Sequence, residues 1–403
     1  MRGTDLFASG PLWVGPAARQ PEHGDNDAGG VRGDVPGDGR GAVWPRVARM
    51  AGVVPAAGGA NAGPGAVPSG WQHASGAGRA DGGIVGTHGG GERAIGPRFD
   101  TPVEPGGYAW WYVDALSEDG RHGLTLIAFI GSVFSPYYAR ARGRGRADPL
   151  QHCAVNVALH GPGGRRWAMT ERGRNSVTRT ATTLGIGSSA LAWDGATLTV
   201  TLDEVTAPWP TRIRGTVRLH AAALTGHAIP LDGAGLHRWQ PIAPCARVEV
   251  ALSDPALRWS GPGYFDTNAG DAPLEDAFAH WHWSRACLPD ATAILYDVCR
   301  RDGAHAPLAL LCDARGNVRE FPPPPPVRLP ATRWRIDRTT RTDEGSVAGV
   351  TRTLEDAPFY ARSLVASQLL GKPVIAVHES LSLTRFRAAW VRMLLPFRMP
   401  RRR

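Results

Sequence analysis

From about residue 99 onward the sequence predicts an all-β fold, and three observations support this prediction. Apolar and polar side chains alternate over short stretches, which is typical of strands with one buried face. Gly, Pro, Asp and Asn stand at the breaks between these stretches. Few segments show the spacing of an amphipathic helix. Strands repeated in this way over about 280 residues indicate antiparallel sandwiches or barrels.

Residues 1–97 are a low-complexity segment of Gly, Ala, Pro, Asp and Arg without a hydrophobic period. Such a chain cannot bury enough apolar surface to offset the entropy lost on ordering. We expect this segment to be disordered and dispensable. An over-extended start codon is the alternative, because the composition is similar to that of translated non-coding sequence.

The clearest strands occupy four stretches in which apolar and polar residues alternate. These stretches are residues 197–205, 213–219, 247–252 and 333–337. The proline run Phe321 to Pro326 has extended polyproline geometry, and we interpret it as an external loop between strands rather than a linker.

So many strands exceed one small barrel, which favours two β units. A Gly-rich turn and a Pro-bearing stretch interrupt the alternation between Gly233 and Ala246. We therefore predict one β unit over residues 98–240, a second over residues 241–383 and a basic tail over residues 384–403.

Positive charge is concentrated in two places. The formal net charge is +9, yet the last twenty residues contain seven Arg and no acid, and four more Arg lie between Arg140 and Arg146. Without a broad basic face, a nucleic-acid partner is not expected. Two local basic patches suit anionic lipid headgroups better.

The predicted tail has the pattern of an amphipathic helix. Its apolar residues share one helical face and are flanked by Arg; they are Phe386, Trp390, Met393, Leu394 and Phe397. Such a segment lies on membranes, and Pro396 would interrupt its last turn. A frayed tail is the alternative.

Cysteine usage and hydropathy predict a cytoplasmic protein. The five Cys are odd in number and show neither a disulfide framework nor zinc-ligand spacing. No apolar run approaches the length of a spanning helix, and the N-terminus lacks the pattern of a secretory signal.

Common catalytic motifs for phosphate, serine, zinc or dinucleotide chemistry are missing from the sequence. Four residues stand out instead. On extended chain His237 and Trp239 share one face, as do Tyr264 and Asp266, so two pairs could meet across a cavity. An acid among aromatic rings has a raised pKa. Spacing alone favours the alternative, in which Asp266 begins an Asx turn and His237 is a core or surface imidazole.

Two aromatic clusters, Tyr108 to Tyr112 and Trp281 to Trp283, fit either a tunnel for a long apolar ligand or barrel core, and core is favoured. His280 and His282 alternate on a strand but lack a third ligand nearby, so no metal site is predicted.

The chain resembles the carotenoid 1,2-hydratases, also called hydroxyneurosporene synthases, over roughly residues 100–385. Several separate blocks occur in the right order: Gly106 to Asp114, Phe129 to Pro136, Gly261 to Gly270, Pro273 to Glu275 and Trp281 to Ala286. The long N-terminal extension is atypical for that pattern.

The resemblance implies two lipocalin-like β-barrel domains and a cofactor-independent enzyme. The implied reaction adds water to the terminal C1=C2 double bond of acyclic carotenoids such as neurosporene and lycopene. The family's functional residues match His237, Trp239, Tyr264 and Asp266 here. The implied partners are an acyclic carotenoid, water, an anionic membrane surface and other enzymes of the carotenoid pathway. The implied location is peripheral, on the inner or photosynthetic membrane.

Two other functions compete with a hydratase: a non-catalytic carotenoid or lipid carrier, and a related two-barrel terpenoid cyclase or isomerase. A carrier has no need of an acid in an apolar pocket. A cyclase is harder to exclude, because an internal alkene can capture the same carbocation.

Overall fold

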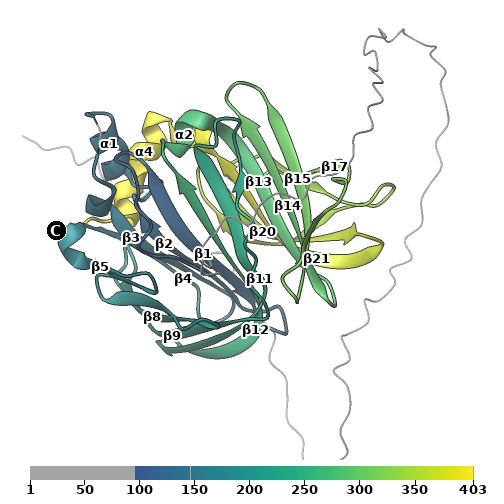
Figure 1. Ribbon diagram of the computed structural model, residues 1–403, viewed down its shortest axis with the longest axis horizontal. Coiled ribbons are helices and arrows are strands. Elements are labelled where there is room, and N and C mark those ends of the chain that lie inside the picture. Colours follow the sequence, from purple (N-terminus) through teal and green to yellow (C-terminus); the bar gives the residue numbers. More distant parts are fainter. Residues whose placement is uncertain (1–95, 146, 403) are drawn as a thin grey trace, which may run out of the picture. The chain divides into compact units, whose positions relative to one another are not determined.

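The computed structural model describes residues 96–145 and 147–402. All but the last two residues of the segment predicted to be disordered lie outside this range. The described chain consists mainly of antiparallel strands with four short α-helices. The all-β prediction is therefore confirmed (Figure 1).

The first sheet curls into a nearly closed barrel. Its order is β4-β3-β2-β1-β12-β11-β9-β8-β7-β6-β5, and β10 pairs with β11. The barrel is open between its two edge strands, β4 and β5. On this side Arg172 of β4 donates a hydrogen bond to Glu204 of β8 at 2.8 Å. Its strands are β1 Tyr108–Leu116, β2 Gly123–Ile130, β3 Cys153–His160, β4 Arg166–Arg172, β5 Val177–Arg179, β6 Thr183–Ile186, β7 Ser189–Trp193, β8 Thr197–Val205, β9 Arg212–Ala221, β10 Ile229–Pro230, β11 His237–Asp254 and β12 Ala256–Gly270.

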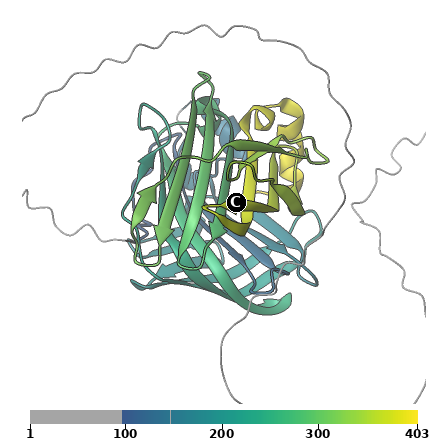
Figure 2. The same cartoon turned by 90° about the vertical axis from the view of Figure 1, so that its right-hand side faces the viewer.

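The second sheet has seven strands in the order β16-β15-β14-β13-β21-β20-β19. A separate pair, β17 and β18, contacts one of its faces (Figure 2). There His378 Nε2 lies 2.9 Å from the Thr339 carbonyl oxygen. The strands are β13 Phe278–Cys287, β14 Ala291–Arg300, β15 His305–Asp313, β16 Val318–Glu320, β17 Pro326–Leu329, β18 Arg338–Arg341, β19 Gly349–Asp356, β20 Tyr360–Leu369 and β21 Lys372–Ser382.

Helices gather at one end of the described fold (Figure 1). Glu275 links helices from distant parts of the chain, because it accepts a hydrogen bond from Arg142 at 2.6 Å and lies 3.6 Å from Arg392. Arg401 pairs with the buried carboxylate of Glu171. The described part of the tail, up to residue 402, is therefore packed rather than frayed. The helices are α1 Pro136–Arg142, α2 Leu274–Ala277, α3 Leu383–Phe386, α4 Ala389–Arg398, and the 3₁₀ turns η1 Pro149–Gln151 and η2 Arg174–Ser176.

Three of the four predicted strands are confirmed, as β8 and as parts of β9 and β11. The fourth, at residues 333–337, is wrong. Arg335 donates its backbone N–H to the Thr332 carbonyl at 2.9 Å and has φ 55°, so this stretch turns before β18 begins. The proline run is confirmed as a loop, because residues 321–325 connect β16 to β17 without regular structure.

The predicted domain boundary at residues 240 and 241 falls inside β11. Register shifts between Pro241 and Ala246 absorb the prolines, so the strand continues to Asp254. The chain passes from the first sheet to the second over residues 271–277. A division of the chain into two folding units stays a prediction.

Alternation along β1 divides its side chains between two cores. Trp111 and Val113 point into the barrel core, the apolar cluster enclosed by the first sheet. Trp110 and Tyr112 point the other way, into the intersheet layer, which is the aromatic cluster between the two sheets. The Tyr108 to Tyr112 cluster is thus barrel core only in part.

Candidate active site

The four predicted residues all face the intersheet layer. His237 and Trp239 lie on β11, and Tyr264 and Asp266 lie on the neighbouring strand β12. Trp239 is paired with Asn268, which places its ring diagonally across from Asp266. The expectation that each pair shares a face is therefore confirmed.

Asp266 is buried, with only 4% of its surface exposed. Its Oδ2 accepts two hydrogen bonds, from Trp239 Nε1 at 2.9 Å and from the Tyr264 hydroxyl at 2.8 Å. Its Oδ1 has no hydrogen-bond partner among the described residues. Burial raises the pKa of Asp266 to about 8, and the carboxylates of Glu379 and Asp114 act in the same direction, against the two hydrogen bonds.

A pKa near 8 leaves Asp266 mostly protonated at neutral pH. Because Oδ2 already accepts two donors, the acid proton belongs on Oδ1, the oxygen that has no partner in the described structure. The arrangement therefore presents one positioned proton donor in apolar surroundings. The alternative of an Asx turn is wrong, because β12 is continuous from Ala256 to Gly270.

His237 does not bond to Asp266. Its Nδ1 lies 3.0 Å from the Tyr108 hydroxyl, and its Nε2 has no partner in the described part of the chain. Burial lowers the pKa of His237, so the ring is neutral and can take up a proton. The close approach of Tyr108 to His237 requires a glycine at position 270. A Cβ there would overlap the Tyr108 ring and come 2.7 Å from His237 Nδ1.

Aromatic rings enclose the acid. Tyr296 of β14 packs edge-on to Trp239 with ring centroids 5.2 Å apart, and Trp283 of β13 lies 5.2 Å from Tyr264. These rings exclude water from the carboxyl, which explains the direction of its pKa. Part of the Trp281 to Trp283 cluster thus belongs to the site as well as to the core.

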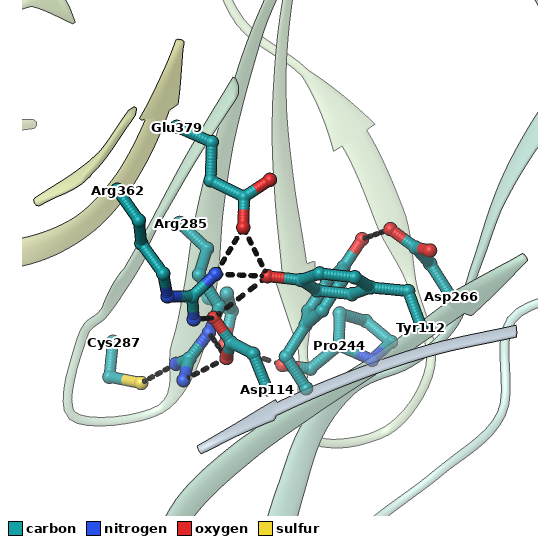
Figure 3. Close-up of polar contacts among 10 residues, drawn as sticks. Tyr112, Asp114, Pro244, Asp266, Arg285, Cys287, Arg362 and Glu379 are labelled. Carbon is teal, nitrogen blue, oxygen red and sulfur yellow. Dashed lines mark hydrogen bonds and ion pairs between the residues drawn. The ribbon is translucent and has the colours of Figure 1, made fainter. Parts of the chain in front are cut away.

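A second buried group adjoins the site and was not predicted from the sequence (Figure 3). This charged network comprises Tyr112, Asp114, Arg285, Arg362 and Glu379. Arg362 donates to Asp114 Oδ2 at 2.6 Å and to the Tyr112 hydroxyl at 2.6 Å, and it pairs with Glu379. Arg285 pairs with Asp114 from the other side. The Tyr112 hydroxyl in turn donates to Glu379 at 2.8 Å.

The remaining candidates lie elsewhere. His280 and His282 point away from Trp281 and Trp283 on β13, and His282 Nδ1 lies 2.9 Å from the Ser380 hydroxyl. Within residues 96–145 and 147–402, no group of three His, Cys, Asp or Glu is placed to hold a metal ion. All five cysteines lie in the described range and are free.

The two acids nearest in sequence to Asp266 both form ion pairs with arginine. Asp271 is at the surface and accepts from Arg238 at 2.9 Å and 3.1 Å. Glu275 joins Arg142 to α4. Both therefore already have an arginine partner.

Comparison with known proteins gives consistent results. Residues 126–403 match the family described as carotenoid hydratase CrtC. The chain is 54% identical over 403 residues to the acyclic carotenoid 1,2-hydratase of Thiocapsa roseopersicina, covering 100% of this chain and 99% of that protein. It is 52% identical over 379 residues to the enzyme of that name from Rubrivivax gelatinosus, covering 93% of each. The Cereibacter sphaeroides enzyme is 41% identical over 278 residues, which are 69% of this chain and 98% of that protein.

The alignment with the Thiocapsa protein spans the whole chain, so it includes residues 1–97. The interpretation of this extension as atypical is therefore wrong for that relative. The family match spans His237, Trp239, Tyr264 and Asp266. The chain belongs to the carotenoid hydratase family.

Proposed function

We propose that this chain adds water across the terminal C1=C2 double bond of acyclic carotenoids such as neurosporene and lycopene, without a cofactor, giving tertiary 1-hydroxy products. The observation that carries the proposal is the buried Asp266 carboxyl, held through Oδ2 by Trp239 and Tyr264 while Oδ1 has no partner among the described residues. This is the form that an acid catalyst needs.

The first step transfers the proton from Asp266 Oδ1 to C2 of the alkene. The π electrons form the new C–H bond, a cation is left on the more substituted C1, and Asp266 becomes a carboxylate. Protonating an alkene needs a positioned acid that still carries its proton, and an apolar site that disfavours the carboxylate keeps that proton on Asp266 until the substrate arrives. Tyr264 and Trp239 then stabilise the carboxylate through the hydrogen bonds that they already make.

The cation at C1 lies among aromatic faces in this proposal. The rings of Trp239 and Tyr264 are rich in electron density on their faces and can stabilise a positive charge by about 2 kcal/mol in a dry site. Trp239 is itself held by the edge of Tyr296. A rigid ring needs no reorganisation when the charge appears.

Water attacks C1 in the second step and loses a proton to His237. The imidazole is neutral, and its Nε2 has no partner in the described structure, so it can orient the water and accept the proton. Acceptance at Nε2 requires the tautomer in which Nδ1–H donates to the Tyr108 hydroxyl. Returning the proton to Asp266 closes the cycle with one water consumed.

The direct test follows the oxygen atom. Purified protein is incubated with lycopene in water labelled with heavy oxygen, and the tertiary alcohol is expected to carry the label. Asp266→Asn keeps the shape of the side chain but cannot supply an acid proton, so turnover should fall at least about 100-fold, the usual effect of losing a general acid.

Asp271→Asn is the matched control, because it removes a carboxylate five positions away that lies at the surface with Arg238. Its turnover should stay close to that of the wild type. Unlabelled cyclic products would favour the cyclase, and bound but unchanged lycopene would favour the carrier. Hydration at near wild-type rate by correctly folded Asp266→Asn would disprove the mechanism.

We also propose that the protein is peripheral, on the cytoplasmic side of the membrane that holds the substrate, and that α4 contacts this membrane. Val391 and Leu395 pack into the intersheet layer, while the opposite side of the helix exposes apolar residues, Met393 by 70% and Phe397 by 69%. No helix in the described residues is long and apolar enough to cross a membrane. An exposed apolar helix face of this kind suits the lipid interface.

Arginine contributes less to this surface than the sequence suggests. Arg142 is buried against Glu275, and Arg401 is paired with Glu171. We therefore expect membrane binding to depend more on apolar contact than on charge. Replacing Met393 and Phe397 with Ser should reduce co-sedimentation with anionic vesicles more than high salt does, and equal binding by the double variant would contradict the proposal.

A further inference from the structure

We propose that Tyr112, Arg362 and Glu379 are positioning residues for the acid Asp266, and that they act through the Tyr112 ring and the Glu379 carboxylate. The inference rests on the proposed function of Asp266. It assigns a role in the reaction to the charged network, which lies beyond the four residues matched to the family pattern.

Tyr112 lies directly opposite Asp266 in the pairing of β1 with β12, and both side chains face the intersheet layer. The Tyr112 ring packs edge-on against Tyr264, with centroids 6.2 Å apart and planes at 66°. Tyr264 in turn donates its hydroxyl to Asp266 Oδ2. A movement of the Tyr112 ring would therefore shift the donor that orients the acid.

The hydroxyl of Tyr112 is fixed at the far end of the ring (Figure 3). It accepts from Arg362 at 2.6 Å and donates to Glu379 at 2.8 Å. Asp114, which is completely buried, accepts a hydrogen bond at its Oδ2 from a second guanidinium nitrogen of Arg362, at 2.6 Å. The Trp283 ring packs edge-to-face with the Tyr112 ring, with centroids 5.6 Å apart. The ring thus has little freedom to tilt or slide.

Stability alone does not account for this network. A buried ion pair is generally no more stabilising than apolar residues of the same volume, because both charges must be desolvated. Here four charged groups share one buried site: Asp114, Arg285, Arg362 and Glu379. Such an arrangement next to an acid indicates an electrostatic or orienting role.

The electrostatic role has a defined sign. Glu379 and Asp114 are negative and oppose ionisation of Asp266, so they favour its proton-bearing form. The other polar groups that face Asp266 come from four strands and are Trp239, Tyr264, Tyr112 and Tyr296. None of these four carries a charge at neutral pH. Glu379 is therefore the residue whose neutralisation should change the titration of Asp266 most directly.

Glu379→Gln tests this role, because it removes one negative charge with little change in shape. It also leaves the positive Arg362 less compensated, and both effects favour the Asp266 carboxylate. The midpoint at which Asp266 loses its proton, and the alkaline limb of kcat/KM, should both move to lower pH by about one unit, as expected for one nearby charge. Infrared difference spectra against Asp266→Asn report that midpoint without substrate.

Glu204→Gln is the matched control. Glu204 is fully buried and, like Glu379, is paired with an arginine, here Arg172, but it lies on β8 in the first sheet. Its replacement should lower thermal stability and leave the alkaline limb in place. A purely structural role for Glu379 would give the same result as this control, with no shift of the limb, and would overturn the inference.

Tyr112→Phe tests the orienting role separately. The phenyl ring keeps its contact with Tyr264 but loses the bonds to Arg362 and Glu379. We expect kcat to fall several-fold with KM nearly unchanged, and Tyr112→Leu, which also removes the ring contact, to lower kcat further. Equal kcat in wild type and both variants would overturn this part.

These outcomes are separate from those of the proposed function. If Asp266→Asn remains active, the acid has been misassigned and the proposed function fails. If Asp266→Asn is inactive while Glu379→Gln titrates like the wild type, the acid stands and only the role of the charged network is wrong.

Discussion

Two faces of the same strands show how this fold separates stability from chemistry. On β12, Phe265 points into the barrel core among aliphatic residues, whereas its neighbour Asp266 points into the intersheet layer among Trp and Tyr. On β1, Val113 and Asp114 divide in the same way. The barrel core needs only apolar volume, so it can hold the strands rigid. The opposite face can then place polar groups in a dry environment at fixed positions.

The comparison also explains why the acid retains its proton. Most side chains of the barrel core are apolar, and the carboxylate buried on that face of β8, Glu204, is held by Arg172 at 2.8 Å and by Ser189 at 2.7 Å. In the intersheet layer Tyr264 and Trp239 satisfy one carboxyl oxygen and leave the other available. Burial without a cationic partner then favours the neutral acid.

The largest expected effect is on the pH dependence of folding. Asp266 has an unfolded pKa of 3.8 and a folded pKa of about 8, so the folded state binds its proton more tightly. Its contribution to stability is fully present below pH 4 and is lost as pH rises towards 8, by about 6 kcal/mol at most. Wild-type stability should fall relative to Asp266→Asn across this window when denaturation is measured at successive pH values. Parallel curves would contradict the raised pKa.

Phe265→Ala should separate the two faces by its effect on stability. Removing this buried ring from the barrel core should cost about 3–5 kcal/mol in the free energy of unfolding. The fraction that stays folded should keep the wild-type pH profile of activity, because Asp266 and its donors face the other way. Denaturant titration measures the first effect. A changed pH profile would show that the two faces are coupled.

A smaller effect is expected at Trp239. Trp239→Ala removes both the aromatic face and the N–H donor to Asp266, and should lower kcat by about 30-fold, which corresponds to about 2 kcal/mol of cation stabilisation. Trp239→Phe keeps a weaker face and should lose less. Loss of the N–H should also move the alkaline limb of kcat/KM upward, since that bond lowers the Asp266 pKa. Equal losses for both variants would argue against a role for the ring.

Spacing alone favoured an Asx turn at Asp266, and the family resemblance was needed to single out the candidate site. Alternation in the sequence was nevertheless enough to predict much of the fold. It located β8, β9 and part of β11, and it placed His237 with Trp239 and Tyr264 with Asp266 on shared faces. It could not predict that Pro241 and its neighbours are absorbed by bulges within β11. Bulges depend on pairing with β12 and not on local composition.

The charged network was missed because its members come from distant strands. Arg362 on β20, which pairs with Glu379 on β21, meets Asp114 on β1 only after the two sheets pack. A weak signal was nevertheless present. Asp114 and Arg285 continue buried aromatic alternations, two residues after Tyr112 and Trp283, where an apolar side chain would be expected. A charge at such a position indicates a buried partner of opposite sign.

The protonation state of Asp266 in the resting enzyme tests the account most directly. Infrared difference spectra between wild type and Asp266→Asn should show the carbonyl band of a protonated carboxylic acid at pH 7, and this band should disappear as pH is raised through about 8. A carboxylate band from Asp266 already at pH 5 would contradict the account, because an acid that has lost its proton before substrate arrives cannot start the reaction.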